Sequence, residues 1–229
     1  MVRLVLWDID HTLVATRGVG TQLFALAFQH VTGREMKRQA RIDGMTDPVI
    51  FHETARLHGI VTSREDFERF AAALGEEHVR HAPALRERGH ALPGAAAALS
   101  GIASFTDTVQ TVVTGNIRTA AEVKLHVFGL DSYINWGIGA FGEDNDERAE
   151  LVRTALDRAQ AESGACVPAS EAVLIGDTPS DVQAGHACGV RVIAVASGRS
   201  DEKVLRDAGA ETALPDLTDT EGLLKLVQG

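Results

Sequence analysis

Three short apolar runs in this chain each end in a cluster of polar residues, and this arrangement constrains the fold more than any other feature. The first run is LVLWDI (residues 4–9), and the second and third end at Val113-Thr114-Gly115-Asn116 and at Ile175-Gly176-Asp177-Thr178. Continuous apolar runs of this length are typical of strands that are buried on both faces of a parallel sheet. Because open α/β sheets bind ligands beyond the carboxyl ends of their strands, we expect the three clusters to converge on one site.

The chain after Leu92-Pro93-Gly94 alternates between helical and strand patterns. Strands are expected in TVQTVVTGN, EAVLIGD and VRVIAVASG, each followed by a helical segment, and the tail carries one short strand and one short helix. Such alternation implies parallel strands joined by right-handed crossovers. The sequence therefore predicts an α/β fold built on a parallel sheet.

A different pattern, helical and polar with no convincing strand, occupies about residues 21–88. One helix is expected to start with Asp47 as its N-cap and Pro48 at its first position, and another with a variant capping box of Ser63 and Asp66. This region is predicted to be an all-helical insert.

The expected boundaries give a discontinuous core domain of residues 1–16 and 92–229 and a helical cap domain of residues 17–91. Within the cap, the segment 41–47 could meet substrate or could be an ordinary interhelical turn, and Arg17 near the first linker leaves the same two readings open.

Composition excludes several classes of protein. The chain has 229 residues and a formal net charge of -10, whereas a nucleic-acid-binding protein usually shows a basic face. No apolar run approaches the ~20 residues that span a bilayer, and acidic residues interrupt the N-terminal apolar stretch too early for a signal peptide. Cys166 and Cys188 form no CxxC and are expected to be free thiols. We therefore expect a cytoplasmic protein, monomeric or homodimeric, that binds neither nucleic acid nor membrane.

The carboxylates at the strand ends indicate a metal site. Asp8 and Asp10 alternate with Ile9, so the backbone must turn there if both are to face one site. Asp177, Asp181 and Asp131 are further candidates for the same cluster. Carboxylates in one crevice repel each other, and a divalent cation relieves that repulsion; all-oxygen ligands favour Mg²⁺.

Donors for an anion are expected beside these carboxylates. The Thr114 hydroxyl and the amides of Gly115 and Asn116 lie at a strand-to-helix turn, and helix N-termini attract anions. An ionised carboxylate can attack a phosphoryl group to form an aspartyl-phosphate, and a second carboxyl can act as general acid and then as general base. The pattern therefore indicates phosphoryl transfer.

These motifs, in this order, resemble those of the haloacid dehalogenase superfamily. Asp8-Ile9-Asp10-His11-Thr12-Leu13 matches its DxDx[TV] motif, Thr114 in VVTGN its second motif, and the segment Gly176-Asp177-Thr178-Pro179-Ser180-Asp181 its GDxxxD motif. The resemblance covers essentially the whole chain. It implies a three-layer, Rossmann-like core on a parallel sheet, plus a small all-helical cap inserted after the first motif.

The resemblance also implies roles for the carboxylates. Asp8 would be the nucleophile and a metal ligand. Asp10 would be the general acid and base and would offer its backbone carbonyl to the metal. Asp177 would bind Mg²⁺ directly, and Asp181 would act through water or by orienting the site.

The expected phosphate-binding residues are Thr114, Gly115, Asn116 and a cation. The family usually places a Lys at the start of the helix before the GDxxxD strand, but no Lys occurs here between Lys124 and Lys203. Arg148 best matches that position, and it supplies a permanent charge and a planar fork of donors. Lys124 competes with it, but we expect Lys124 to face solvent because it lies late on its helix.

The function that the resemblance implies is a magnesium-dependent phosphatase for a small phosphorylated metabolite, similar to phosphoglycolate phosphatases. Three alternatives remain: a sugar phosphomutase of the β-phosphoglucomutase type, a 2-haloacid dehalogenase, and a non-catalytic protein that binds a phosphorylated ligand. Asp10 argues against the dehalogenase, which lacks the second Asp of the first motif. The intact set of carboxylates argues against the non-catalytic protein.

Overall fold

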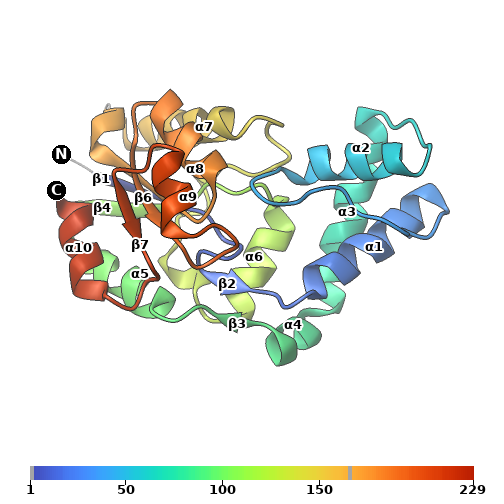
Figure 1. The fold of residues 1–229 in the computed structure, drawn as a ribbon, viewed down its shortest axis with the longest axis horizontal. Helices are drawn as coiled ribbons and strands as arrows, with labels where there is room; N and C mark the ends of the chain where they lie inside the picture. The colour runs from blue at the N-terminus through green and yellow to red at the C-terminus, as the bar shows by residue number, and fades with distance from the viewer. Residues whose placement is uncertain (1–2, 165–166) are drawn as a thin grey trace.

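A five-stranded parallel sheet forms the centre of the computed structural model, which describes residues 3–164 and 167–229. Its strand order is β4-β1-β5-β6-β7, and every neighbouring pair is parallel (Figure 1). The strands are β1 (Arg3–Trp7), β4 (Thr108–Val112), β5 (Ala172–Gly176), β6 (Arg191–Val195) and β7 (Thr212–Leu214). The α/β fold predicted from the sequence is confirmed.

Helices cover both faces of this sheet because the inner strands bury alternate side chains on opposite sides. In β1, Val5 and Trp7 pack with α5 (Ala95–Ala103), α6 (Arg118–Val127) and α10 (Thr220–Gln228). Leu4 and Leu6 pack on the other side with α7 (Arg148–Ser163) and α8 (Pro179–Ala187). The short helix α9 (Glu202–Asp207) packs with α8 and β6, and single 3₁₀ turns occur at η1 (Asp131–Tyr133) and η2 (Ala169–Glu171). The result is the expected three-layer core.

Four helices form a second cluster beside the sheet, on the right in Figure 1. They are α1 (Val19–Thr32), α2 (Asp47–Leu57), α3 (Arg64–Arg80) and α4 (Ala82–Arg88). Aromatic rings fill their interior, where the rings of Phe51 and Phe70 stack with centroids 4.5 Å apart. Helix α6 adds Ile117, Ala120 and Val127 from the sheet side, so α6 packs against both clusters.

The chain crosses twice between the sheet cluster and the helical cluster, and the two crossing segments pair with each other. The sequence did not indicate this pairing. β2 (Val14–Ala15) and β3 (His90–Ala91) form a two-residue antiparallel ladder. The pairing brings the start and the end of the helical segment together next to the first motif.

Two expectations about helix starts have different outcomes. The capping box of Ser63 and Asp66 is confirmed. The expectation that Asp47 caps its helix is wrong by one residue: Thr46 has the extended N-cap conformation and Asp47 is the first helical residue. The physical reason is that the Asp47 carboxylate is used elsewhere, since its Oδ2 accepts a hydrogen bond from the Ile117 amide at 2.8 Å.

Two further features concern membrane-spanning helices and the cysteines. Within residues 3–164 and 167–229, no helix combines the length and the apolar character that crossing a membrane requires. Cys188 is a free thiol that lies 3.3 Å from the Ala149 carbonyl oxygen. Cys166 lies outside the described residues.

Candidate active site

The chain turns sharply after β1, as the alternation of Asp8 and Asp10 requires. The amides of Thr12, Leu13 and Val14 all point to the Ile9 carbonyl oxygen, at 3.3, 2.9 and 3.1 Å. His11, inside this turn, has a positive φ of 62°. The turn places both Asp8 and Asp10 in the wall of one cavity.

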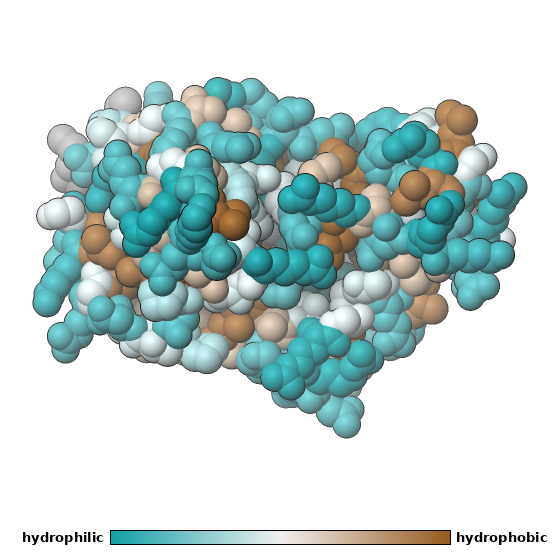
Figure 2. Space-filling view, in the orientation of Figure 1, coloured by the Kyte–Doolittle hydropathy of each residue, from teal (hydrophilic) through white to brown (hydrophobic). Residues whose placement is uncertain are grey.

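This cavity lies between the carboxyl ends of the strands and the helices α1–α3. Its volume is about 150 Å³, and its walls include residues of all three polar clusters singled out in the sequence: Asp8 and Asp10, Thr114 with its two neighbours, and Asp177 with Thr178. The space-filling view shows the surface indented between the two groups of elements (Figure 2). The expected convergence of the three clusters is therefore present.

Three buried carboxylates lie together, and two of them, Asp8 and Asp177, are in the wall of this cavity. Oxygens of Asp8, Asp177 and Asp181 all lie within 4.8 Å of one another. Burial raises the pKa of Asp177 to about 9, and the charges of Asp8 and Asp181 add to the effect. Burial also raises the pKa of Asp8, to about 7, against the opposing charge of Arg148. Such a group of oxygens suits a hard divalent cation, whose charge would oppose both shifts by favouring the ionised carboxylates.

Arg148, the first residue of α7, lies among these carboxylates. Its Nη2 donates to Asp8 Oδ1 at 2.5 Å. Its Nε lies 2.6 Å from Asp181 Oδ1, an ion pair without hydrogen-bond geometry. The residue is only 8% exposed. Burial disfavours its charge, but Asp181 and Asp8 outweigh this and raise its pKa, so Arg148 stays protonated beside the expected nucleophile.

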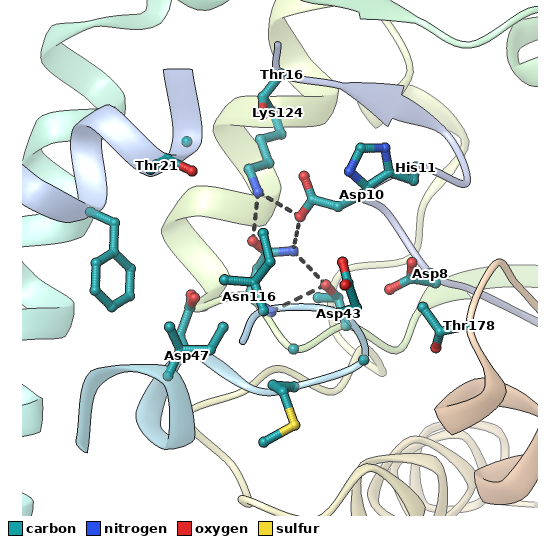
Figure 3. Close-up of a pocket in the computed structure, with 18 of the residues that line it drawn as sticks. Asp8, Asp10, His11, Thr16, Thr21, Asp43, Asp47, Asn116, Lys124 and Thr178 are labelled. Carbon is teal, nitrogen blue, oxygen red and sulfur yellow. Dashed lines mark hydrogen bonds and ion pairs between the residues drawn. The ribbon is translucent and has the colours of Figure 1, made fainter. Parts of the chain in front are cut away.

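A second network surrounds Asp10. The Lys124 Nζ donates to Asp10 Oδ2 and to Asn116 Oδ1, both at 2.6 Å. The Asn116 amide group donates to Asp10 Oδ2 and to Thr114 Oγ1, both at 2.7 Å. Figure 3 shows the side chains of Lys124, Asp10 and Asn116 meeting in this network. Burial disfavours the Asp10 carboxylate, yet the charge of Lys124 and these hydrogen bonds lower its pKa below the ordinary value.

The expectation that Lys124 faces solvent is wrong, since the residue is 5% exposed. The reason is that α6 is covered on two sides, by the sheet cluster and by α3. The helical spacing carried a signal, because Ala120, Ala121 and Leu125 lie on the buried face with Lys124.

The turn after β4 brings Thr114 and Gly115 to the cavity. Thr114 is fully buried, and its Oγ1 accepts from the backbone amide of Asn116 at 3.2 Å. Gly115 lies against the backbone of Met45, and a Cβ at this position would overlap the Met45 carbonyl oxygen. Its own carbonyl accepts from the Asp47 amide at 2.7 Å. A glycine is therefore required where the helical cluster touches this strand end.

Asp181 is placed to support the site. Its Oδ2 accepts from the Thr178 amide at 3.0 Å and from the Thr178 hydroxyl at 2.6 Å, which completes the capping box of α8. Its other oxygen faces Arg148. Asp177 has a different environment, because Gly198 approaches it so closely that a Cβ there would overlap Asp177 Oδ2. Thr12 lies between the two halves of the site, with its Oγ1 3.4 Å from both Asp8 Oδ2 and Asp177 Oδ1.

Asp131, a candidate from the sequence, is not part of the site. It lies in η1, where its Oδ2 is 2.8 Å from His126 Nδ1. Helix α6 starts at the strand ends and runs away from them, so a residue beyond its C-terminus lies at the other edge of the sheet.

Residues of the helical cluster complete the cavity, and sequence reasoning found only part of them. The segment 41–47 reaches the cavity through Ile42, Asp43, Gly44, Met45 and Asp47, whereas Arg17 and Arg41 are not in its wall. Phe24 and Ile50 supply apolar surface, and His78 and Leu74 approach from α3. No motif marked these side chains, because their positions depend on how the helices pack over the sheet.

Comparison with known proteins gives a family and several folds. The sequence matches the family of haloacid dehalogenase-like hydrolases over residues 5–186. Among curated proteins, no significant match is found. A hydrolase from Pseudomonas syringae is 22% identical, with a TM-score of 0.69 and 99% of each chain covered. A predicted phosphoglycolate phosphatase from Haemophilus somnus 129pt is 14% identical, with a TM-score of 0.67 and 97% of each chain covered.

A third similar structure is a protein of Bacteroides vulgatus assigned as a β-phosphoglucomutase. It is 20% identical, with a TM-score of 0.63, and the match covers 99% of this chain and 90% of that one. At these identities the three structures show a shared fold and do not show a shared substrate.

Proposed function

Because the chain belongs to the family of haloacid dehalogenase-like hydrolases, we propose that it is a magnesium-dependent phosphatase that hydrolyses a small phosphomonoester through an aspartyl-phosphate on Asp8. The observation that carries this proposal is the position of Asp8. Its carboxylate is buried at the base of a cavity, 2.5 Å from the guanidinium of Arg148 and grouped with Asp177. A nucleophile, a fixed cation and candidate metal ligands therefore lie in contact.

The donor set fits Mg²⁺. The side chains of Asp8 and Asp177 and the backbone carbonyl of Asp10 would hold the ion. Asp181 would orient the site, since Thr178 and Arg148 engage both of its oxygens. When bound, the ion supplies positive charge for a phosphate that must approach several carboxylates. The grouping of the carboxylates supports this assignment, because oxygens of Asp8, Asp177 and Asp181 lie within 4.8 Å of one another and such buried oxygens favour a cation.

The chain's own groups account for the two chemical steps. An Asp8 oxygen attacks phosphorus and the bond to the leaving oxygen breaks, while Arg148, Thr114 and the adjoining backbone hold the phosphoryl oxygens. Asp10 gives a proton to the leaving oxygen and then takes one from the water that hydrolyses the aspartyl-phosphate. Lys124 favours ionised Asp10, which is the form that the second step needs.

We assign residues 17–91 the role of a cap that opens for substrate and closes over the site. Two contacts between residues 17–91 and the core support this role: the Asp47 amide donates to the Gly115 carbonyl at 2.7 Å, and Arg199 pairs with Asp43 at 3.2 Å. Closure of this kind excludes water from the reacting groups. A cavity of about 150 Å³ also suits a small metabolite.

A phosphate-release screen tests the proposal. Purified protein is incubated with p-nitrophenyl phosphate and a panel of small phosphomonoesters, with Mg²⁺ or with a chelator, and the Asp8→Asn protein is the blank. We expect phosphate release that needs Mg²⁺ and is absent in the variant. Conversion of a phosphosugar into its isomer without free phosphate would favour the phosphomutase. Tight binding of a metabolite without turnover would favour a non-catalytic protein.

A further inference from the structure

The wall of the cavity contributed by the helical cluster contains an unsatisfied acceptor. His78 is 2% exposed and lines the cavity, and its Nδ1 lies 2.9 Å from the Leu74 carbonyl oxygen. A carbonyl oxygen can only accept, so Nδ1 carries the hydrogen and Nε2 presents a lone pair. That Nε2 is buried and has no hydrogen-bond partner. Burial lowers the pKa of His78 to about 4, so the ring is neutral near pH 7.

Asp47 gives a second acceptor to the same cavity. Its Oδ2 accepts from the Ile117 amide at 2.8 Å, and the residue is largely buried in the cavity wall. Figure 3 shows its carboxyl group pointing toward the space in front of Asn116 and Lys124. Buried polar atoms are almost always paired in native proteins, so a buried acceptor without a partner in a residue of the cavity wall points to a donor on the molecule that fills the cavity.

The charges in the cavity wall point the same way. Among the described residues the wall holds the carboxylates of Asp8, Asp10, Asp43, Asp47 and Asp177, and two permanent cations, Lys124 and Arg148. Both cations are already engaged, with Asp10 and with Asp8. In the part of the chain that the structure describes, the helical cluster contributes no Lys or Arg to this wall. Of these carboxylates, Asp43 is paired with Arg199, which lies outside the wall. A second anionic group on the substrate, beyond the phosphate, would meet the remaining carboxylates and no free Lys or Arg of the wall.

We propose that the leaving group of the substrate is a small alcohol that carries a further hydrogen-bond donor, a hydroxyl or an ammonium group, and no negative charge. His78 Nε2 and the Asp47 carboxylate accept from that donor, and Phe24 and Ile50 cover the carbon atoms. The inference rests on the proposed phosphatase function and specifies its substrate class. It excludes carboxylated phosphates such as phosphoglycolate as preferred substrates, and it equally disfavours a substrate that presents a second phosphate to this wall.

Four phosphates built on the same two-carbon unit test this substrate class. In 2-hydroxyethyl phosphate the second carbon carries a hydroxyl, and in phosphoethanolamine it carries an ammonium group. In ethyl phosphate it carries no donor, and in 2-phosphoglycolate it is a carboxylate. We expect kcat/KM for at least one of the first two to exceed that of ethyl phosphate by about tenfold, the effect of pairing a buried acceptor. Phosphoglycolate is expected to be the poorest of the four. The better of the first two then identifies the donor.

Two variants connect the preference to the proposed residues. Asp47→Asn keeps an acceptor for the Ile117 amide and replaces a charged oxygen with a donor, so the ratio of kcat/KM for phosphoglycolate over phosphoethanolamine should rise about tenfold. His78→Phe removes the acceptor and keeps a ring, so the advantage of the donor-bearing substrates over ethyl phosphate should fall. His81→Phe is the matched control, because His81 lies outside the cavity wall.

The outcomes separate the two proposals. If phosphoglycolate is hydrolysed best, the substrate class is wrong and the phosphatase function stands. If neither these four compounds nor p-nitrophenyl phosphate releases phosphate, the phosphatase function fails and the substrate class falls with it. If His78→Phe does not fold, as circular dichroism would show, the wild-type series and Asp47→Asn still decide, since an unchanged ratio in Asp47→Asn contradicts the assignment of Asp47.

Discussion

Replacing Arg148 with Met should destabilise the protein in a way that depends on pH and on Mg²⁺. The guanidinium contacts Asp8 and Asp181, and all three side chains are almost fully buried. Removing one partner of a buried pair costs about 3–5 kcal/mol, because the remaining charge is left uncompensated. With a urea m-value of roughly 3 kcal/mol/M for a chain of this size, the midpoint of unfolding should fall by on the order of 1 M.

The sign of the pH dependence follows from the raised pKa values. Asp8 at about 7 and Asp177 at about 9 lie above their unfolded value of 3.8, so the folded state holds more protons than the unfolded state between these limits. Their contribution to stability is therefore present at low pH and is lost as the pH rises. Without Arg148 both pKa values rise further, so the variant's deficit should be largest at pH 8 and should shrink by about 1 kcal/mol at pH 5, mainly through Asp8.

Urea unfolding of metal-free protein at pH 5, 7 and 8, followed by circular dichroism, measures this effect. Arg148→Lys is the control, because it keeps a positive charge and loses the planar guanidinium that contacts both Asp8 and Asp181. It should lower the free energy of unfolding by less than Arg148→Met does. Mg²⁺ at pH 8 should recover part of the loss. A loss below about 1 kcal/mol at pH 7, or a deficit that does not change between pH 5 and 8, would refute the reasoning that Arg148 compensates these carboxylates.

Three other predictions concern neighbouring residues. Lys124→Met should move the acid limb of the pH–rate profile to higher pH, because the charge and the hydrogen bond of Lys124 are what most oppose the effect of burial on the pKa of Asp10; Lys124→Arg should move it less. Gly198→Ala should weaken Mg²⁺ binding at least tenfold by calorimetry, because the new Cβ displaces the Asp177 carboxylate, and an unchanged affinity would exclude Asp177 as a ligand. Burial lowers the pKa of His78 from 6.5 to about 4, so as the pH falls the imidazole is protonated in the unfolded chain before it is protonated in the folded protein. The free energy of unfolding should therefore fall by roughly 3 kcal/mol between pH 6.5 and pH 4 because of His78. His78→Phe should remove that part of the pH dependence.

The sheet and the convergence of its polar clusters could be predicted from the sequence because both depend on local patterns. Apolar runs such as LVLWDI form strands buried on both faces, and parallel strands bring their carboxyl ends to one edge. The contact of Arg148 with Asp8 also follows from order along the chain, since α7 begins at the same edge. These inferences need no knowledge of how the helical cluster packs.

The features that were missed depend on packing between distant segments. Lys124 is buried because α3 covers the face of α6 that the sheet leaves free; the spacing of apolar residues in α6 marks that face but does not identify the helix that covers it. Asp47 was expected to cap its own helix, but its carboxylate accepts from the Ile117 amide of another helix. His78 belongs to a long amphipathic helix, and only the folded structure places this residue in the cavity wall with its Nε2 buried and unpaired.

Trapping the covalent intermediate tests the central claim most directly. The Asp10→Asn protein is mixed with p-nitrophenyl phosphate and Mg²⁺, since nitrophenolate leaves without a general acid while hydrolysis of the aspartyl-phosphate still needs a base. The account predicts a burst of one nitrophenolate per protein molecule and a phosphoryl group on Asp8 in the peptide mass spectrum. A phosphoryl group on any residue other than Asp8 would contradict it. So would an Asp10→Asn protein that turns over p-nitrophenyl phosphate at the wild-type rate but gives no burst and no labelled peptide.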